Sequence, residues 1–178
     1  ILASLVKALK TGEGSLVETS LMEALLDFQF EVLTTHLNDG KRNPVRSSYN
    51  NAHAYLSAPY GIYKTKDNYI AIAMTPVPAL GELLNLETIT KYTDQKDWFL
   101  KRDEIKKLIG DWLVTESTEH WLSILQPADI WCAEVLEWEK MLEHEGFKVL
   151  DMLQRIKRSD GLDIETLRCP IRINNEVF

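Results

Sequence analysis

The residues of this sequence that could act as metal ligands are spread along the chain. Its four histidines are His36, His53, His120 and His144, and none has a second His or Cys three or four positions away. Ligands on one face of a helix would need that spacing to share a zinc ion. We therefore expect each histidine on a helix surface or in a loop.

The two thiols offer little more chemistry. Cys132 and Cys169 have neither the paired spacing of a zinc site nor the density of a disulfide scaffold. Arg168 stands beside Cys169, and such a charge can lower the pKa of a thiol. Inert packing is the favoured interpretation, and we expect both thiols to be buried.

Acidic residues gather around His144. Glu137, Glu139, Glu143 and Glu145 lie within one short stretch. A metal cluster is conceivable here, but acids alternating on a short helix usually form a solvated face. We expect no metal site.

No self-sufficient catalytic motif occurs in the sequence. The patterns G-x-G-x-x-G, H-E-x-x-H, C-x-x-C and G-x-S-x-G are absent, as is a P-loop. Gly12 and Gly14 follow a helical stripe, whereas a phosphate-binding loop follows a strand, so we interpret them as a plain turn. The five tryptophans recur at positions typical of a hydrophobic core: Trp98, Trp112, Trp121, Trp131 and Trp138.

Composition narrows the function classes. The 178 residues are 45% hydrophobic and 26% charged, which is typical of one compact globular domain. A net charge of −7 leaves no basic surface for nucleic acid or an anionic membrane. No apolar run approaches the roughly 18 residues of a membrane span. We expect a cytoplasmic protein.

The N-terminal third contains two helical patterns and a long polar stretch. The first pattern ends at residues 11–14, and residues 15–19 are strand-like. Ser20 and Glu23 have the spacing of a capping box, and the wide apolar stripe that follows predicts a deeply buried helix. Residues 38–58 have no period of either kind, which indicates a binding loop, a lid or a crossing between domains.

The remainder alternates helix and strand. Residues 60–65 and 69–74 predict a hairpin that turns at 66–68. Two helical patterns cover 80–84 and 98–112, and Ser117 is positioned to cap a helix through Leu125. A strand at 130–135, an acidic helix from 136 to 145 that Gly146 ends, and strands at 147–156 and 164–173 complete a mixed α/β order.

Two stretches of the sequence match known patterns. Residues 11–24 fit T-G-x-G-Q-x-V-x-x-S-L-x-x-A, except that Ser15 replaces Gln. Residues 58–68 fit A-P-x-x-x-Y-x-T-x-D-G, with Asn68 in place of Gly. Because Asn tolerates the left-handed conformation, we expect the hairpin to survive that change. With these two stretches the sequence resembles the family III CoA-transferases, which include formyl-CoA transferases, carnitine dehydratase and bile-acid-inducible protein F.

The resemblance implies a particular organisation. Family members are interlocked homodimers whose subunits have a Rossmann-like large domain and a smaller domain joined by long linkers. The chain begins at Ile1 inside a helical pattern, so we expect a segment of a longer protein. On this view residues 1–59 are helices and a linker crossing from the large domain, 60–147 are the small α/β domain, and 148–178 are return strands and a linker.

The resemblance also implies the chemistry. A family transferase moves CoA between an acyl-CoA and a carboxylic acid through an aspartyl intermediate, with the CoA thioester as substrate and no further cofactor. No Asp here stands in a matching motif, so we assign no catalytic residue and no metal ligand. Tyr60 and Gly61, at the hairpin entrance, are the candidates for lining the acyl site. The glycine-rich loop of formyl-CoA transferases has no counterpart at residues 55–59.

Two alternatives remain open at this point. An α-methylacyl-CoA racemase of the same family would abstract a proton next to the thioester instead of transferring CoA. A non-enzymatic acidic interaction module would use the long loop to contact a partner protein.

Overall fold

A small antiparallel sheet forms the centre of the structure. The computed structural model describes residues 1–49, 53–174 and 176–177. Strands β1 (Gly61–Lys64), β2 (Tyr69–Ile72) and β3 (Cys132–Glu134) pair in that order. Ile62 lies opposite Ala71, and Ala71 lies opposite Ala133, so these three residues form a row across the sheet. The predicted hairpin and the strand at 130–135 are confirmed.

Side chains of the hairpin turn hold the sheet together. Asn68 donates from Nδ2 to Oε1 of Glu134 at 2.6 Å and to the carbonyl oxygen of Val135 at 3.2 Å. Asn68 is not among the residues with positive φ, so the hairpin persists for a reason other than the left-handed conformation. Its amide bridges the turn to β3, which a glycine could not do.

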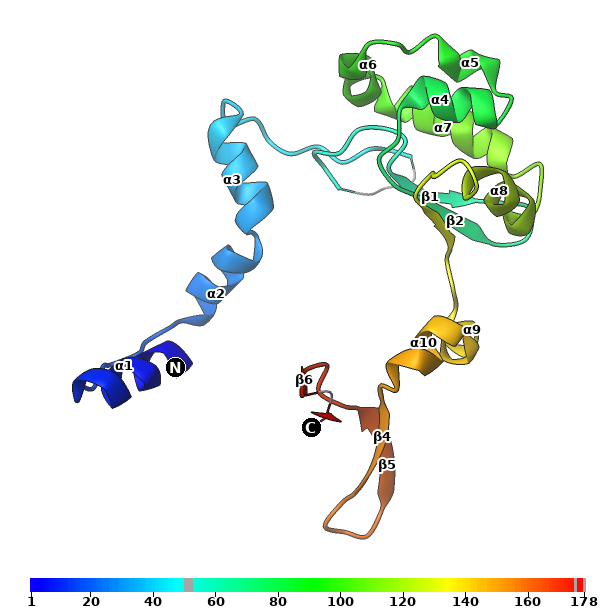
Figure 1. Cartoon of the computed structure of the whole chain (residues 1–178). Helices are drawn as coiled ribbons and strands as arrows, with labels where there is room; N and C mark the ends of the chain where they lie inside the picture. Colours follow the sequence, from blue (N-terminus) through cyan, green and yellow to red (C-terminus); the bar gives the residue numbers. More distant parts are fainter. Residues whose placement is uncertain (50–52, 175, 178) are drawn as a thin grey trace.

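Five helices cover one face of this sheet (Figure 1). They are α4 (Val77–Leu83), α5 (Glu87–Thr90), α6 (Gln95–Leu100), α7 (Arg102–Leu113) and α8 (Thr118–Leu125). The core between helices and sheet contains Tyr63, Ile70, Ile72, Leu80, Ile89, Ile105, Ile109, Leu113 and Leu125. Ser117 accepts a hydrogen bond from the backbone N of His120 at 3.2 Å, so the predicted cap of the helix ending at Leu125 is confirmed.

The chain between the hairpin and α8 is more broken than predicted. Two helical patterns were expected, whereas four short helices are present. Asn85 takes a positive φ of 53° and interrupts the path after α4. Asp94 then accepts a hydrogen bond from the backbone N of Lys96 at 2.9 Å and starts α6. Local turn geometry and capping therefore override the longer apolar period.

The N-terminal part consists of α1 (Leu2–Thr11), α2 (Leu21–Phe28) and α3 (Phe30–Asn38). The predicted capping box is confirmed, because Ser20 N donates to Glu23 Oε2 at 2.8 Å and Glu23 N donates to Ser20 Oγ at 3.2 Å. Residues 15–19 form no strand, and the helix breaks at Gln29. None of the three helices buries a side chain in this chain, so the prediction of a deeply buried helix is wrong here.

The C-terminal part contains α9 (Trp138–Glu143), α10 (Glu145–Leu150), β4 (Leu153–Lys157), β5 (Asp163–Leu167), β6 (Arg172–Ile173) and β7 (Glu176–Val177). Gly146 lies inside α10 rather than ending a helix, because His144 Nδ1 accepts a hydrogen bond from Gly146 N at 3.1 Å and caps a new one. Residues 147–150 are therefore helical, not extended. Gly161, with φ of 89°, lies in the turn that connects β4 to β5.

Arg168 fastens this C-terminal hairpin to α10. Its guanidinium donates to the carbonyl oxygens of Leu150 at 2.7 Å and Asp151 at 2.6 Å, and it is only 7% exposed. The neighbouring Cys169 is exposed, so the prediction that both thiols are buried is wrong for this residue.

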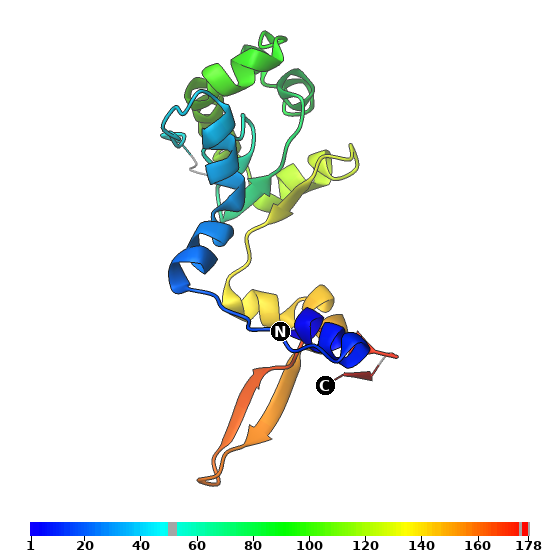
Figure 2. The same cartoon turned by 90° about the vertical axis from the view of Figure 1, so that its left-hand side faces the viewer.

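Figures 1 and 2 show the two terminal parts extending away from the compact unit of sheet and helices. Both parts carry exposed apolar side chains, among them Leu2, Leu21, Phe28, Trp138 and Val149. Within the described residues, no helix has both the length and the apolar character needed to cross a membrane.

Candidate functional site

A pocket of about 830 Å³ lies across the face of the sheet that the helices leave open. Successive residues of a strand point to opposite faces, and here Tyr63, Ile70 and Ile72 point into the core. The row of Ile62, Ala71 and Ala133 therefore faces the pocket and forms a shallow apolar floor. The small alanines create the space that larger strand residues would fill.

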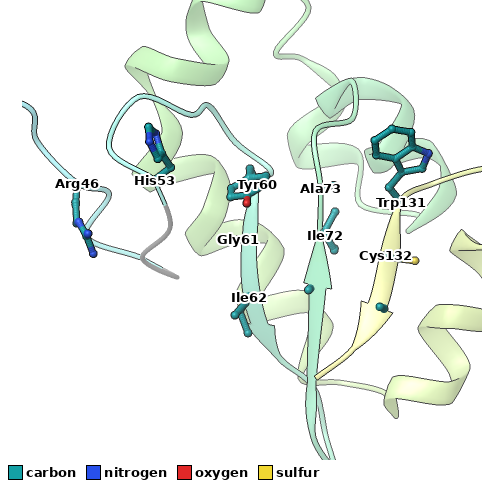
Figure 3. Close-up of a pocket in the computed structure, with 11 residues that line it drawn as sticks. Arg46, His53, Tyr60, Gly61, Ile62, Ile72, Ala73, Trp131 and Cys132 are labelled. Atoms are coloured by element: carbon teal, nitrogen blue, oxygen red, sulfur yellow. The ribbon is translucent and has the colours of Figure 1, made fainter. Parts of the chain in front are cut away.

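Tyr60 and Gly61, the two residues predicted to bind substrate, both line this pocket (Figure 3). They lie where the long loop enters β1. Tyr63 fixes this entrance, because its buried hydroxyl donates to the carbonyl oxygen of Pro59 at 2.5 Å. Burial raises the pKa of the Tyr63 hydroxyl far above its ordinary value, so it remains a protonated donor. Whether Tyr60 and Gly61 contact a substrate stays a prediction.

Trp131 borders the pocket on the β3 side. Its carbonyl oxygen accepts a hydrogen bond from Ala73 N at 2.8 Å, which extends the pairing of β2 with β3 by one step. The indole is 71% exposed. The prediction that all tryptophans belong to the core is therefore wrong for Trp131, and also for Trp138, which is 75% exposed. An aromatic residue before a short strand carries no signal that separates a pocket wall from a core position.

Arg46 and His53 border the pocket on the opposite side (Figure 3). Both belong to the predicted polar loop at 38–58, of which residues 39–49 and 53–58 form no helix or strand, whereas Asn38 still belongs to α3. Tyr55 N donates to Nδ1 of His53 at 3.2 Å, and Nε2 of His53 lies 3.8 Å from Oε1 of Glu31. Because Nδ1 accepts this hydrogen bond, the proton of a neutral imidazole lies on Nε2, which faces Glu31.

The sequence predicts a functional loop at 38–58 but neither of these two residues as part of a site. His53 was expected only in a loop or on a helix surface, and no role was predicted for Arg46. The one available signal was the unusual length of the loop, since long loops in compact domains are often functional. The positions of Arg46 and His53 depend on contacts with residues far away in the sequence.

The pocket supplies a binding surface rather than a nucleophile. Among the described residues that line it, none is a carboxylate. Cys132 is half-buried, and burial raises the pKa of its thiol, so a thiolate is disfavoured there. The polar groups that line the pocket include the guanidinium of Arg46, the imidazole of His53 and the phenol of Tyr60. Elsewhere in the described chain, no group of three or more His, Cys, Asp or Glu could hold a metal ion.

The fold is thus a mixed α/β unit with an open, largely apolar pocket, and comparison with known sequences gives its family. The sequence profile of CoA-transferase family III matches residues 1–177. This chain belongs to CoA-transferase family III, and the prediction from the two motifs is confirmed.

Two curated proteins are similar to this chain. A cinnamoyl-CoA:phenyllactate CoA-transferase of Clostridium sporogenes is 29% identical over 181 residues, which cover 94% of this chain and 42% of that protein. An acyl-CoA transferase of Fusarium pseudograminearum is 24% identical over 159 residues, covering 86% of this chain and 34% of that protein. The chain thus spans less than half the length of these relatives.

Solved structures with the same fold support the α/β class. A Mycobacterium tuberculosis protein superposes with a TM-score of 0.73 at 19% identity, covering 99% of this chain and 46% of that one. A CAIB/BAIF family protein from Brucella suis gives a TM-score of 0.68 at 18% identity, covering 99% of this chain and 46% of that one. At such identities the similarity concerns the fold, and the predicted mixed α/β fold of a family III CoA-transferase is confirmed.

Proposed function

We propose that this chain is part of an acyl-CoA:carboxylate CoA-transferase, which moves CoA between an acyl-CoA and a carboxylic acid. Membership of CoA-transferase family III and the transferase names of both curated relatives support this proposal. The observation that carries it to a site is the pocket, which combines an apolar floor with a cation at its edge. An acyl-CoA and an organic acid each present an apolar body next to a polar group.

Covalent catalysis through an Asp is the proposed mechanism. The Asp carboxylate attacks the thioester carbonyl, the C–S bond breaks, and CoA leaves as a thiolate, which gives a mixed anhydride. The thiolate then attacks the aspartyl carbonyl, which releases the first acid and forms an enzyme-bound CoA thioester. The carboxylate of the second acid attacks this thioester and expels the CoA thiolate, which gives a second mixed anhydride. The thiolate then attacks the acyl carbonyl of this anhydride, which forms the new acyl-CoA and regenerates the Asp carboxylate. No Asp of this chain stands in a matching family motif, so we propose that this Asp lies outside the 178 residues.

The residues of this chain would bind and orient rather than react. In our proposal, Ile62, Ala71 and Ala133 contact the apolar part of the acyl group, and Tyr60 with Gly61 lines its entrance. Arg46 would pair with the carboxylate of the acid, because a guanidinium can bind both oxygens of a carboxylate. Binding energy gained away from the thioester then orients the reacting atoms.

The intact protein is proposed to be a cytoplasmic homodimer. Exposed apolar side chains on α1, α2, α3, α9 and α10 support coverage of these helices by more protein. Large exposed apolar patches are uncommon on soluble monomers and often mark interaction surfaces. A second copy or other parts of the same polypeptide would remove it from water.

CoA transfer by the full-length gene product that contains this chain tests the proposal. A panel of acyl-CoA donors and carboxylic acids is assayed for acyl exchange, with the 178-residue chain in parallel. The proposal requires exchange by the full-length protein and none by the 178-residue chain alone. Loss of chirality at the α-carbon of a 2-methylacyl-CoA without exchange would instead identify a racemase, and absence of both activities and of CoA binding would favour an interaction module.

A further inference from the structure

Two adjacent residues at the start of α7 hold the loop segments that border the pocket. Arg102 donates from its guanidinium to the carbonyl oxygen of Ala54 at 2.7 Å and also to that of Val45. It is only 9% exposed. We call the segments that border the pocket, residues 45–49 and 53–54, the pocket loop. One buried guanidinium therefore binds the main chain at the start of the first segment and at the end of the second.

Asp103 holds the first of these segments by its carboxylate. Its Oδ1 accepts hydrogen bonds from Ser47 Oγ at 2.7 Å and from Ser48 N at 2.8 Å. Ser47 is 3% exposed, although its neighbours in the loop are exposed. The hydrogen bond from Ser47 is the main cause that holds the pKa of Asp103 below its ordinary value, so the carboxylate is charged at neutral pH.

These bonds fall next to the two pocket residues of the loop. Arg46 lies between Val45, which Arg102 binds, and Ser47, which Asp103 binds. His53 directly precedes Ala54. Each pocket residue is thus adjacent in sequence to a residue fixed by a charged side chain of α7.

We infer that Arg102 and Asp103 are positioning residues, which hold Arg46 and His53 at the edge of the pocket. Charge-assisted hydrogen bonds are shorter and stronger than neutral ones, so they can order a loop that has no ladder of its own. The side chains at a helix start commonly bond their own helix, whereas these two reach residues 48 to 57 positions away. The consequence for substrate binding rests on the proposed transferase function.

Hydrogen exchange and steady-state kinetics on the full-length protein test this inference together. D103A removes the acceptor of both loop bonds, D103N keeps a neutral Oδ1 acceptor, and R102K keeps the charge but loses the fork that binds two carbonyls. E119A is the matched control, because Glu119 is an exposed acid in the first turn of α8, as Asp103 is an acid in the first turn of α7, and it does not line the pocket. The amides of β1 and β2 report whether the fold is intact.

If Asp103 positions the loop, amide exchange and KM should change together while the sheet remains folded. In D103A, amide exchange over residues 45–49 accelerates about tenfold or more, while β1 and β2 stay protected. The KM for the carboxylic acid rises about tenfold with a smaller change in kcat, because the displaced Arg46 weakens binding more than chemistry. D103N partly restores both quantities, R102K accelerates amide exchange over residues 53–55, and E119A matches the wild type.

Two results would overturn the inference. Unchanged exchange over residues 45–49 in D103A means that Asp103 does not hold the loop. Faster amide exchange with an unchanged KM means that Asp103 holds the loop but that the loop does not position a binding residue, while the transferase function stands. A wild-type protein without CoA-transfer activity refutes the proposed function instead, and amide hydrogen exchange then decides by itself whether Asp103 holds the loop.

Discussion

The carboxylate of Asp67 accepts two hydrogen bonds from one distant residue, Thr118. The donors are the backbone N of Thr118 at 2.9 Å and its Oγ1 at 3.0 Å. Thr65 Oγ1 lies 2.7 Å from Thr118 Oγ1 and completes the cluster. The hairpin turn therefore caps the first turn of α8, which packs against β3. The T-x-D part of the second family motif, Thr65 and Asp67, therefore stabilises the contact between the hairpin turn and α8 and lies outside the pocket.

Acid should weaken the contribution of Asp67 to stability. The backbone hydrogen bond from Thr118 is the main cause that lowers the pKa of Asp67. A lowered pKa gives stability that is present above the unfolded-state pKa of about 3.9 and is lost as the pH falls through the folded-state pKa. Urea unfolding of wild type and D67N should differ most above about pH 5 and converge towards pH 2. A difference that stays constant over this range would contradict the assignment.

A methyl group at Gly81 should destabilise the helical layer. A Cβ there would lie 2.8 Å from Cγ1 of Ile89 and 2.9 Å from Cγ2 of Thr90. Overpacking of this kind costs about 1–3 kcal/mol, more than the helix propensity that alanine gains. Gly81→Ala should lower the urea midpoint, while Gly14→Ala, whose Cβ meets nothing within 4 Å, should not. An equal midpoint for both variants would show that the helices relax without cost.

Filling the apolar floor should block the pocket without unfolding the sheet. Ala71 lies on the open face, between Ile62 and Ala133. Ala71→Phe should raise the KM for acyl-CoA about tenfold or more in the full-length enzyme, since a ring there occupies the acyl space. Lys64→Phe is the control, because Lys64 is exposed on β1 but does not line the pocket. Equal KM values for the two variants would place acyl binding elsewhere.

Loss of the cation at the pocket edge should weaken binding of the acid. Arg46→Ala should raise the KM for the carboxylic acid about tenfold, and Arg46→Lys should raise it less, because the charge remains but the fork is lost. Arg42→Ala controls for charge in the same loop, since Arg42 pairs with Asp39 outside the pocket. If Arg42→Ala has the same effect, the role of Arg46 is one of general charge.

The sequence predicts the elements that local signals define. The hairpin at 60–74, the capping box at Ser20 and the cap at Ser117 all depend on residues a few positions apart, and all three are present. Prediction from the sequence fails where a distant contact or another local signal determines the secondary structure. His144 turns the apolar residues 147–150 into a helix by capping it, and periodicity alone cannot separate short apolar strands from helices.

The residues of the candidate site likewise fall into two groups, those predicted from the sequence and those placed by distant contacts. Tyr60 and Gly61 follow from their place at a hairpin entrance after a long loop, and both line the pocket. Arg46 and His53 reach it through bonds from Arg102 and Asp103, and no local pattern encodes such contacts.

Photolabelling of the full-length protein tests the central claim most directly. The probe is an acyl-CoA with a diazirine at the end of its acyl group, and peptide mapping after irradiation locates the label. The pocket predicts label within residues 60–73 and 131–133, suppressed by excess unlabelled acyl-CoA. Label that is suppressed in the same way but is absent from both segments would contradict the assignment of this pocket as the acyl site.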